Sequence, residues 1–287
     1  MKRVLITFGG SAYDKTTQET VNRALFLGVD KVLVYDDVWL RQHEFYSTNR
    51  WLFDLPGVKG LCWFAFKPLV IMDALERCEP GEIVCYIDGD TYPIADLTPL
   101  YDRCAADGGQ MLFAAQGCSN RQWVKSDCWD VMAANRDLLF SQQDSTPNLW
   151  PGRRDVPIDS QHAVARFMLF QQGHWHVRQF LMEWLTYCLN PLATTFDLSI
   201  LHQDCYDCHG EGEARPEDPV FEQHRTEQAI LSLLAHKYSF KLYREADAFG
   251  NNELEKHGTD SWYPQCFVQE FGSGPRTNAG SRFRNTL

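Results

Sequence analysis

The chain has 287 residues, of which 44% are hydrophobic and 23% charged, a composition typical of one globular domain with a sizeable core. Its formal net charge of −11 argues against a general nucleic-acid or anionic-membrane surface, which needs a basic footprint. No apolar run approaches the length of a membrane span, and the apolar start is too short for a signal peptide, so we expect a cytoplasmic protein.

Apolar residues alternate between strand-like and helix-like patterns along the chain. Short β-branched runs predict strands, and a 3.6-residue repeat predicts helices. Strands are expected over 2–8, 31–35, 83–87, 110–115, 166–170 and 239–243, and helices over 16–27, 66–77, 126–140, 175–189 and 224–237. This alternation predicts an α/β fold, in which helices flank a mostly parallel central sheet.

The first predicted strand ends in Thr7-Phe8-Gly9, and the second is followed by Asp36. α/β folds bind nucleotides at the carboxyl ends of parallel strands, and glycine permits close backbone approach there. The third glycine of the dinucleotide fingerprint is missing, so a plain strand-to-helix turn is the alternative.

Lys67 precedes Pro68 at the expected helix start. A cation at this position can reach a diphosphate, and a helix N-terminus itself favours anions. The alternative is a solvated lysine whose stem packs on Trp63.

The apolar run from 83 to 87 ends in Asp88-Gly89-Asp90. Two carboxylates one residue apart at a strand end suit a divalent cation, because Mg²⁺ and Mn²⁺ prefer oxygen ligands and keep positions open for phosphates. An acidic turn is the alternative, since Asp and Gly are ordinary turn residues.

The segment VCYIDGDTYPIADLTPLY, residues 84–101, resembles the metal-binding strand end of GT-A fold, nucleotide-sugar-dependent glycosyltransferases, and most of all their retaining family 8 branch. The resemblance implies a Rossmann-like sheet in a single domain with a C-terminal lid or acceptor region. It also implies that Asp88 helps seat the nucleotide and that Asp90 binds Mn²⁺ or Mg²⁺.

The same resemblance assigns further residues. Glu227-Gln228 is similar to the Asp-Gln helix start that lies beside the transferred sugar in family 8, and Asp159 falls in a loop that faces sugar and acceptor. The alternative for Glu227 is a carboxylate that caps a polar helix N-terminus. Gln269 stands where that family has a histidine ligand, and is the expected third metal ligand, with Glu270 and His257 as the alternatives. The base and ribose contacts fall on Thr7, Phe8 and Asp36, and diphosphate contact on Lys67.

We therefore expect a metal-dependent glycosyltransferase that moves a sugar from a nucleotide diphosphate sugar, such as a UDP-sugar, to a saccharide or other hydroxyl acceptor. We expect a glycosyltransferase domain over 1–271, with a nucleotide half at 1–115 and a sugar and acceptor half at 116–271. The Gly, Arg, Asn and Ser content of 272–287 predicts a flexible tail or lid. A sugar nucleotidyltransferase and a non-catalytic nucleotide- or carbohydrate-binding protein remain alternatives. Transfer to modified DNA is disfavoured by the charge of −11.

The ten cysteines are scattered, as expected of free thiols in a reduced core. Cys205 and Cys208 form a CxxC between His202 and His209, for which structural zinc is possible and a plain loop with reduced thiols is favoured.

Overall fold

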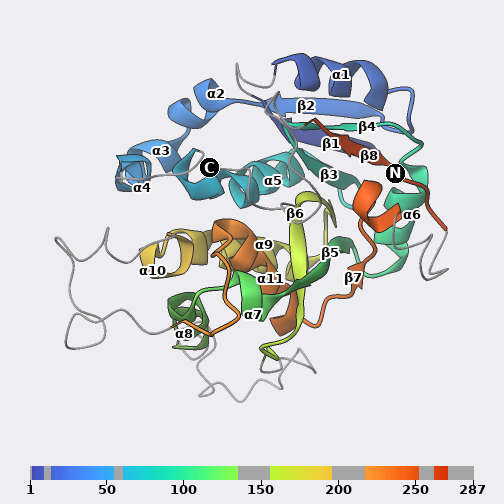
Figure 1. Ribbon diagram of the computed structural model, residues 1–287. Helices are drawn as coiled ribbons and strands as arrows, with labels where there is room; N and C mark the ends of the chain where they lie inside the picture. The colour runs from blue at the N-terminus through green and yellow to red at the C-terminus, as the bar shows by residue number, and fades with distance from the viewer. Residues whose placement is uncertain are drawn as a thin grey trace.

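The computed structural model describes residues 2–9, 14–54, 61–134, 156–195, 217–251 and 262–270. Within these residues, a six-stranded sheet has the strand order β2-β1-β3-β6-β5-β7. Figure 1 shows helices on both sides of this sheet. The strands are β1 (Arg3–Phe8), β2 (Lys31–Tyr35), β3 (Ile83–Asp88), β5 (Gln110–Ser119), β6 (Gln161–Gln171) and β7 (Leu242–Tyr243).

Strand β6 runs opposite to the other five strands of the sheet in the described residues. β1 pairs in parallel with β2 and β3, β5 pairs in parallel with β7, and β6 is antiparallel to both β3 and β5. The expected α/β fold with a mostly parallel sheet is thus confirmed, with one reversed strand that the sequence pattern did not predict. Because Phe167 lies opposite Ile87, the residues before Phe167 lie beside the carboxyl end of β3.

Eleven α-helices are described in this part of the chain. They are α1 (Asp14–Ala24), α2 (Asp37–Gln42), α3 (Glu44–Thr48), α4 (Arg50–Asp54), α5 (Phe66–Glu76), α6 (Thr98–Ala106), α7 (Asn120–Trp123), α8 (Ser126–Ala134), α9 (Trp175–Cys188), α10 (Pro191–Thr194) and α11 (Thr226–Lys237). None of them is long and apolar enough to cross a bilayer.

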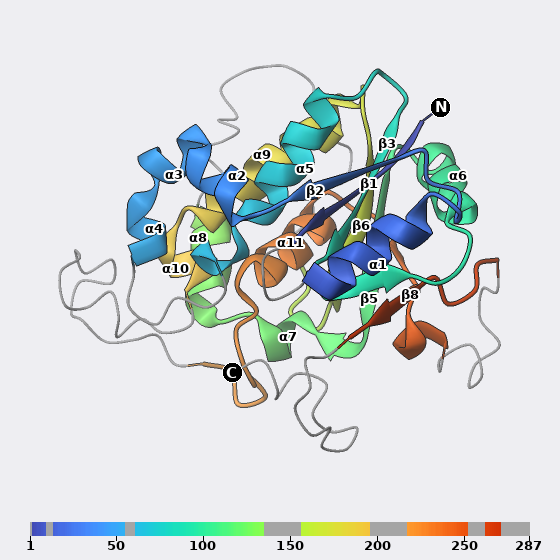
Figure 2. The same ribbon diagram turned by 90° about the horizontal axis from the view of Figure 1, so that it is seen from above.

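Two buried cores lie on the two faces of the sheet, because successive strand side chains point to opposite sides. Val4 and Ile6 of β1 pack with α5, α9 and α11, whereas Leu5 packs with α6. Figure 2 shows α5, α9 and α11 on one side of the strands and α6 on the other. The candidate site lies between these layers, at the end of the sheet where β1 and β3 have their carboxyl ends.

Several predicted boundaries were wrong. The helix expected over 16–27 ends at Ala24, and β6 begins at Gln161, five residues earlier than expected, because Gln161 pairs with Ser119. The strand expected over 239–243 contains only Leu242–Tyr243, since Ser239 has a φ of +55° and forms the turn after α11. The part of the helix expected beyond residue 134 lies outside the described residues.

The sequence pattern also missed elements. It did not predict α2, α3 and α4, or the two-stranded antiparallel ribbon of β4 (Thr91–Pro93) and β8 (Phe267–Gln269). This ribbon places Gln269 opposite Thr91, the residue after Asp90. The expected domain division stays a prediction, and the expected tail at 272–287 lies outside the described residues.

Candidate active site at the carboxyl end of β3

Asp88 is the last residue of β3, and Asp90 follows it before β4. Five consecutive buried residues, from Ile83 to Ile87, hold the strand in the core up to this point. Tyr86 donates a hydrogen bond to Asp88 Oδ1 at 2.9 Å. Burial, together with the negative charge of Asp88, raises the pKa of the Asp90 carboxyl. Two neighbouring carboxylates in this setting favour the approach of a cation.

Lys67, in the first turn of α5, links Asp88 to the start of α11. Its Nζ lies 2.9 Å from Asp88 Oδ1 and 2.9 Å from Glu227 Oε1, and donates to the Ala165 carbonyl oxygen at 3.2 Å. Burial alone would lower the pKa of this ammonium, but the charges of Asp88 and Glu227 outweigh it and raise the pKa. Lys67 is 5% exposed, so it is not the solvated lysine of the alternative reading.

Glu227 and Gln228 lie at the start of α11, as expected, but they have different partners. Glu227 is 3% exposed, and Thr226 donates to its Oε2 at 2.5 Å. The φ of Thr226 is +44°, a left-handed conformation that a threonine adopts only when its surroundings hold it. Gln228 donates to the Ala163 carbonyl oxygen at 3.0 Å. The structure therefore joins Glu227 to Asp88 through one lysine, and attaches Gln228 to β6.

Gln269, on β8, contacts the second aspartate. Its Nε2 donates to Asp90 Oδ2 at 2.8 Å, and Thr91 Oγ1 donates to Asp90 Oδ1 at 3.0 Å. The Glu270 backbone N–H also donates to the Asp90 carbonyl oxygen at 2.8 Å. The residue expected as third metal ligand thus lies beside Asp90, with its amide nitrogen rather than its oxygen toward the carboxylate.

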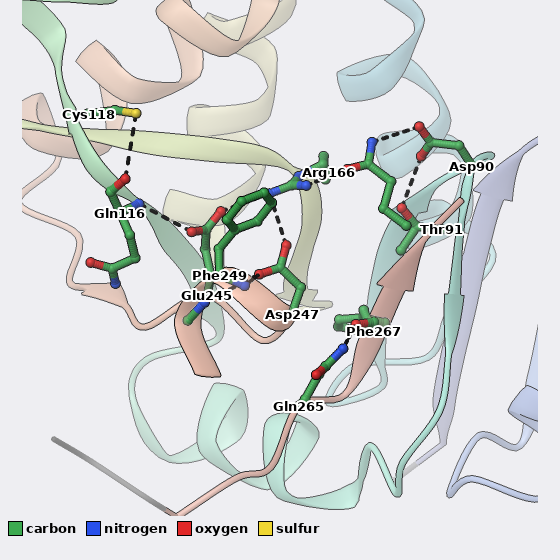
Figure 3. Close-up of polar contacts among 12 residues, drawn as sticks. Asp90, Thr91, Gln116, Cys118, Arg166, Glu245, Asp247, Phe249, Gln265 and Phe267 are labelled. Carbon is green, nitrogen blue, oxygen red and sulfur yellow. Dashed lines mark hydrogen bonds and ion pairs between the residues drawn. The ribbon is translucent and has the colours of Figure 1, made fainter. Parts of the chain in front are cut away.

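Arg166 connects Gln269 to two further carboxylates that sequence reasoning missed. Its Nη1 donates to Gln269 Oε1 at 2.5 Å, and its Nη2 lies 2.8 Å from Glu245 Oε1 and 3.0 Å from Asp247 Oδ2. Figure 3 shows Arg166 between Glu245 and Asp247 on one side and Asp90 on the other. Burial alone would lower the pKa of the guanidinium, but Asp247 and Glu245 outweigh it and raise the pKa.

Two signals in the sequence could have revealed this group. Arg166 is a charged residue that interrupts the apolar run from Ala163 to Phe170. Glu245 and Asp247 follow β7 with the same acid-x-acid spacing that Asp88 and Asp90 have at β3. Neither signal predicts that the acidic residues after β3 and those after β7 lie close together.

The charges at this edge of the sheet are unbalanced in the described residues. The carboxylates of this group are Asp88, Asp90, Glu227, Glu245 and Asp247, and its basic side chains are Lys67 and Arg166. With all seven ionised, the group carries three excess negative charges. An oxygen-rich, negatively charged donor set fits Mg²⁺ or Mn²⁺. The described residues hold no group of three or more His, Cys, Asp or Glu that could bind a metal, so Asp88 and Asp90 would need ligands from substrate or water.

The residues expected at the nucleotide lie at the same sheet edge, because Phe8 pairs with both Tyr35 and Asp88. The ring of Phe8 stacks on Phe66 with centroids 4.0 Å apart. Thr7 is fully buried, and its Oγ1 has no hydrogen-bond partner among the described residues. The backbone N–H of Gly9 donates to the Tyr35 carbonyl oxygen.

Asp36 has a structural role in this arrangement. Its Oδ1 accepts the Trp39 backbone N–H at 2.7 Å, which caps α2. The predicted contact between Asp36 and the nucleotide stays a prediction.

Asp159 belongs to a different group of charges. Its side chain is 71% exposed and lies 3.6 Å from Arg121, which also pairs with Asp218 at 2.9 Å. The contacts in the described part of the chain do not bring Asp159 to Asp88 or Glu227. Cys205 and Cys208 lie outside the described residues.

No protein-family profile and no curated protein matches the chain. Among solved structures, it is similar to apo mouse xyloside xylosyltransferase 1, with 9% identity and a TM-score of 0.47 over 96% of this chain and all of that one. It is similar to the apo bifunctional glycosyltransferase WbbM, with 11% identity and a TM-score of 0.43 over 86% of this chain and 39% of that one. The apo glycosyltransferase GlyE of Streptococcus pneumoniae TIGR4 shares 13% identity and a TM-score of 0.37 over 90% of this chain and 50% of that one.

Proposed function

We propose that the protein is a metal-dependent glycosyltransferase that moves a sugar from a nucleotide diphosphate sugar to a saccharide or other hydroxyl acceptor, with a UDP-sugar as the first donor to test. The observation that supports this most is the pair Asp88 and Asp90 at the end of a buried strand, in a group of side chains with three excess negative charges. Such a group has affinity for a divalent cation and for the diphosphate that the cation carries.

A bound Mn²⁺ or Mg²⁺ would neutralise the charge that develops on the leaving diphosphate, which is Lewis-acid catalysis. Asp88 and Asp90 would hold the ion, while Thr7, Phe8 and Gly9 would line the nucleotide end of the same sheet edge. Lys67 keeps Asp88 and Glu227 in fixed positions, since its ammonium contacts both carboxylates at 2.9 Å. Its three N–H bonds already have acceptors, so diphosphate contact would require it to leave one of them.

The acceptor side of the site would lie toward α11. Glu227 and Gln228 lie in the first turn of this helix, whose N-terminus favours negative charge. Lys67 bridges Glu227 to Asp88. If the sugar keeps its configuration, these two residues would flank the anomeric carbon. If the configuration inverts, a carboxylate must take the acceptor proton, for which Glu227 is better placed than the exposed Asp159.

The test combines ligand-induced stabilisation with turnover. UDP with Mn²⁺ should raise the melting temperature, because a ligand at 100 times its Kd stabilises the folded state by about 2.7 kcal/mol. Asp90→Asn should remove this shift and donor-sugar transfer. Asp54→Asn, at an exposed ion pair with Arg50 on α4, should leave both unchanged.

Failure of the wild-type protein to respond to any nucleotide with Mn²⁺ or Mg²⁺ would overturn the proposal. Release of pyrophosphate from UTP and a sugar phosphate, without sugar transfer, would replace it with nucleotidyl transfer.

A further inference from the structure

Arg166 is held in place by two carboxylates that are themselves fixed. Glu245 is fully buried, and its second oxygen accepts the Gln116 backbone N–H at 3.2 Å. Asp247 is 4% exposed, and its second oxygen accepts the Phe249 backbone N–H at 2.9 Å. Figure 3 shows these contacts around the guanidinium. The guanidinium therefore has little freedom to turn away from Gln269.

The position of Arg166 determines which end of the Gln269 amide faces Asp90. A guanidinium has donors only, so the atom of Gln269 that meets Nη1 at 2.5 Å must be the oxygen. The nitrogen then points to Asp90 Oδ2, 2.8 Å away, and an ionised carboxylate accepts hydrogen bonds only. Both neighbours require the same amide orientation.

We propose that Gln269 is a positioning residue whose amide nitrogen holds the Asp90 carboxylate, and that Arg166, fixed by Glu245 and Asp247, holds Gln269 in that orientation. The proposal rests on the proposed function for its link to the metal. Gln269 would then stabilise the geometry of Asp90 without giving an oxygen to the ion, which differs from the ligand role that the family resemblance implies.

The first measurement uses the metal-free protein. Side-chain amide signals of ¹⁵N-labelled glutamine identify Gln269 by their loss in Gln269→Ala. Arg166→Lys keeps the positive charge near Glu245 and Asp247 but lacks the second nitrogen of the guanidinium fork. It should move the Gln269 amide signals and speed their exchange with water, as should Asp90→Asn. Glu245→Gln serves as a second variant if Arg166→Lys does not fold, since it weakens the hold on Arg166.

The second measurement separates positioning from ligation. Gln269→Ala should lower the affinity for Mn²⁺ with UDP by roughly ten-fold, the lower end of what is lost when a partner of a metal ligand is removed. Arg166→Lys should have a similar effect, and the double variant should lose no more, because both changes break one chain of contacts. The number of waters on the bound Mn²⁺, measured by electron–nuclear double resonance, should stay the same in all variants. Glu222→Gln, at an exposed residue, is the matched control and should not change the affinity.

Failure of the positioning role of Gln269 and failure of the proposed function give different results. One additional water on Mn²⁺ in Gln269→Ala would make Gln269 a ligand and overturn the proposal. Gln269 amide signals that do not respond to Arg166→Lys, Glu245→Gln or Asp90→Asn would overturn it as well. A wild-type protein that binds no divalent cation would instead contradict the proposed function, while the metal-free amide signals would still decide whether Arg166 orients Gln269.

Discussion

At the scale of single residues, Lys67 is the buried link of the candidate site. Its ammonium has three N–H bonds, and the structure provides acceptors at Asp88, Glu227 and Ala165. The lysine that was expected to contact phosphate thus also has a structural role, because its single positive charge is shared by two carboxylates, Asp88 and Glu227.

We expect Lys67→Met to destabilise the fold by about 3 to 5 kcal/mol, since removing one partner of a buried ion pair leaves uncompensated charge. Urea unfolding measures this. Lys2→Met is the control, because Lys2 is 67% exposed in its pair with Glu82 and should contribute less than about 1 kcal/mol. A loss below about 1 kcal/mol in Lys67→Met would show that water reaches the pair.

His162 gives a pH dependence of stability. Its Nδ1 lies 2.8 Å from Asn120 Oδ1, and its Nε2 is buried without a partner in the described part of the chain. Burial, with smaller effects of Arg225 and His236, lowers the pKa of this imidazole to about 3. In the unfolded chain, the His162 imidazole therefore binds a proton as the pH falls below about 6.5. In the folded protein the same imidazole stays neutral until the pH approaches 3.

Stability from His162 should be fully present above pH 6.5 and should be lost as pH falls toward 3. Between pH 7.5 and 5, the wild type should lose about 2 kcal/mol more than His162→Gln. Urea unfolding of both proteins across this range measures the difference. Parallel curves for the two proteins would mean that the ring accepts a proton in the folded state.

At the scale of elements, the ribbon of β4 and β8 completes the candidate site. Each strand has only three residues, so their pairing alone is weak. Phe267 anchors β8, because it is fully buried and stacks on Phe167 with ring centroids 5.0 Å apart. Gln269 is two residues farther along the same strand.

Phe267→Ala should cost about 3 to 5 kcal/mol of stability, as expected for a buried aromatic truncated to alanine. It should also lower Mn²⁺ affinity in the presence of UDP, because β8 loses the contact that sets its register with Thr91. Phe26→Ala, at an 88% exposed ring, should stay within about 0.5 kcal/mol of the wild type. An Mn²⁺ affinity that survives in folded Phe267→Ala would show that other contacts place Gln269.

The sequence predicted local features better than non-local ones. Asp88 and Asp90 were found because a run of five apolar residues points to them. The contacts of Arg166 with Glu245 and Gln269 were missed because these two residues lie 79 and 103 positions from Arg166 along the chain, and no periodic pattern reports such pairing. The reversed direction of β6 was missed for a similar reason, since antiparallel and parallel buried strands have the same apolar pattern.

At the scale of the whole molecule, the cysteines confirm the expectation of free thiols for the described residues. Each of the eight that the structure describes is a thiol rather than half of a disulfide, and only Cys78 of these is partly exposed. Burial raises the pKa of the Cys62 and Cys128 thiols to about 12, and that of Cys78 to about 11.

We therefore expect slow reaction of the native thiols with a disulfide reagent at pH 8, with Cys78 first, and rapid reaction of all eight after unfolding. Cys205→Ser with Cys208→Ser removes the two cysteines outside the described residues. Counting reactive thiols spectrophotometrically, with Cys78→Ser as the control, tests this. Several fast-reacting thiols in the native Cys78→Ser background would contradict the buried placement.

The pairing of Asp90 with Gln269 also has a consequence for biosynthesis. The two residues are 179 positions apart. At roughly 5 to 20 residues per second, a ribosome makes Gln269 about 10 to 35 s after Asp90. Strands β1, β2, β3, β5 and β6 are complete by Gln171, well before β8 exists. A nascent chain can therefore assemble most of its sheet before Gln269 contacts Asp90, so that the proposed activity arises only after β8 has been made.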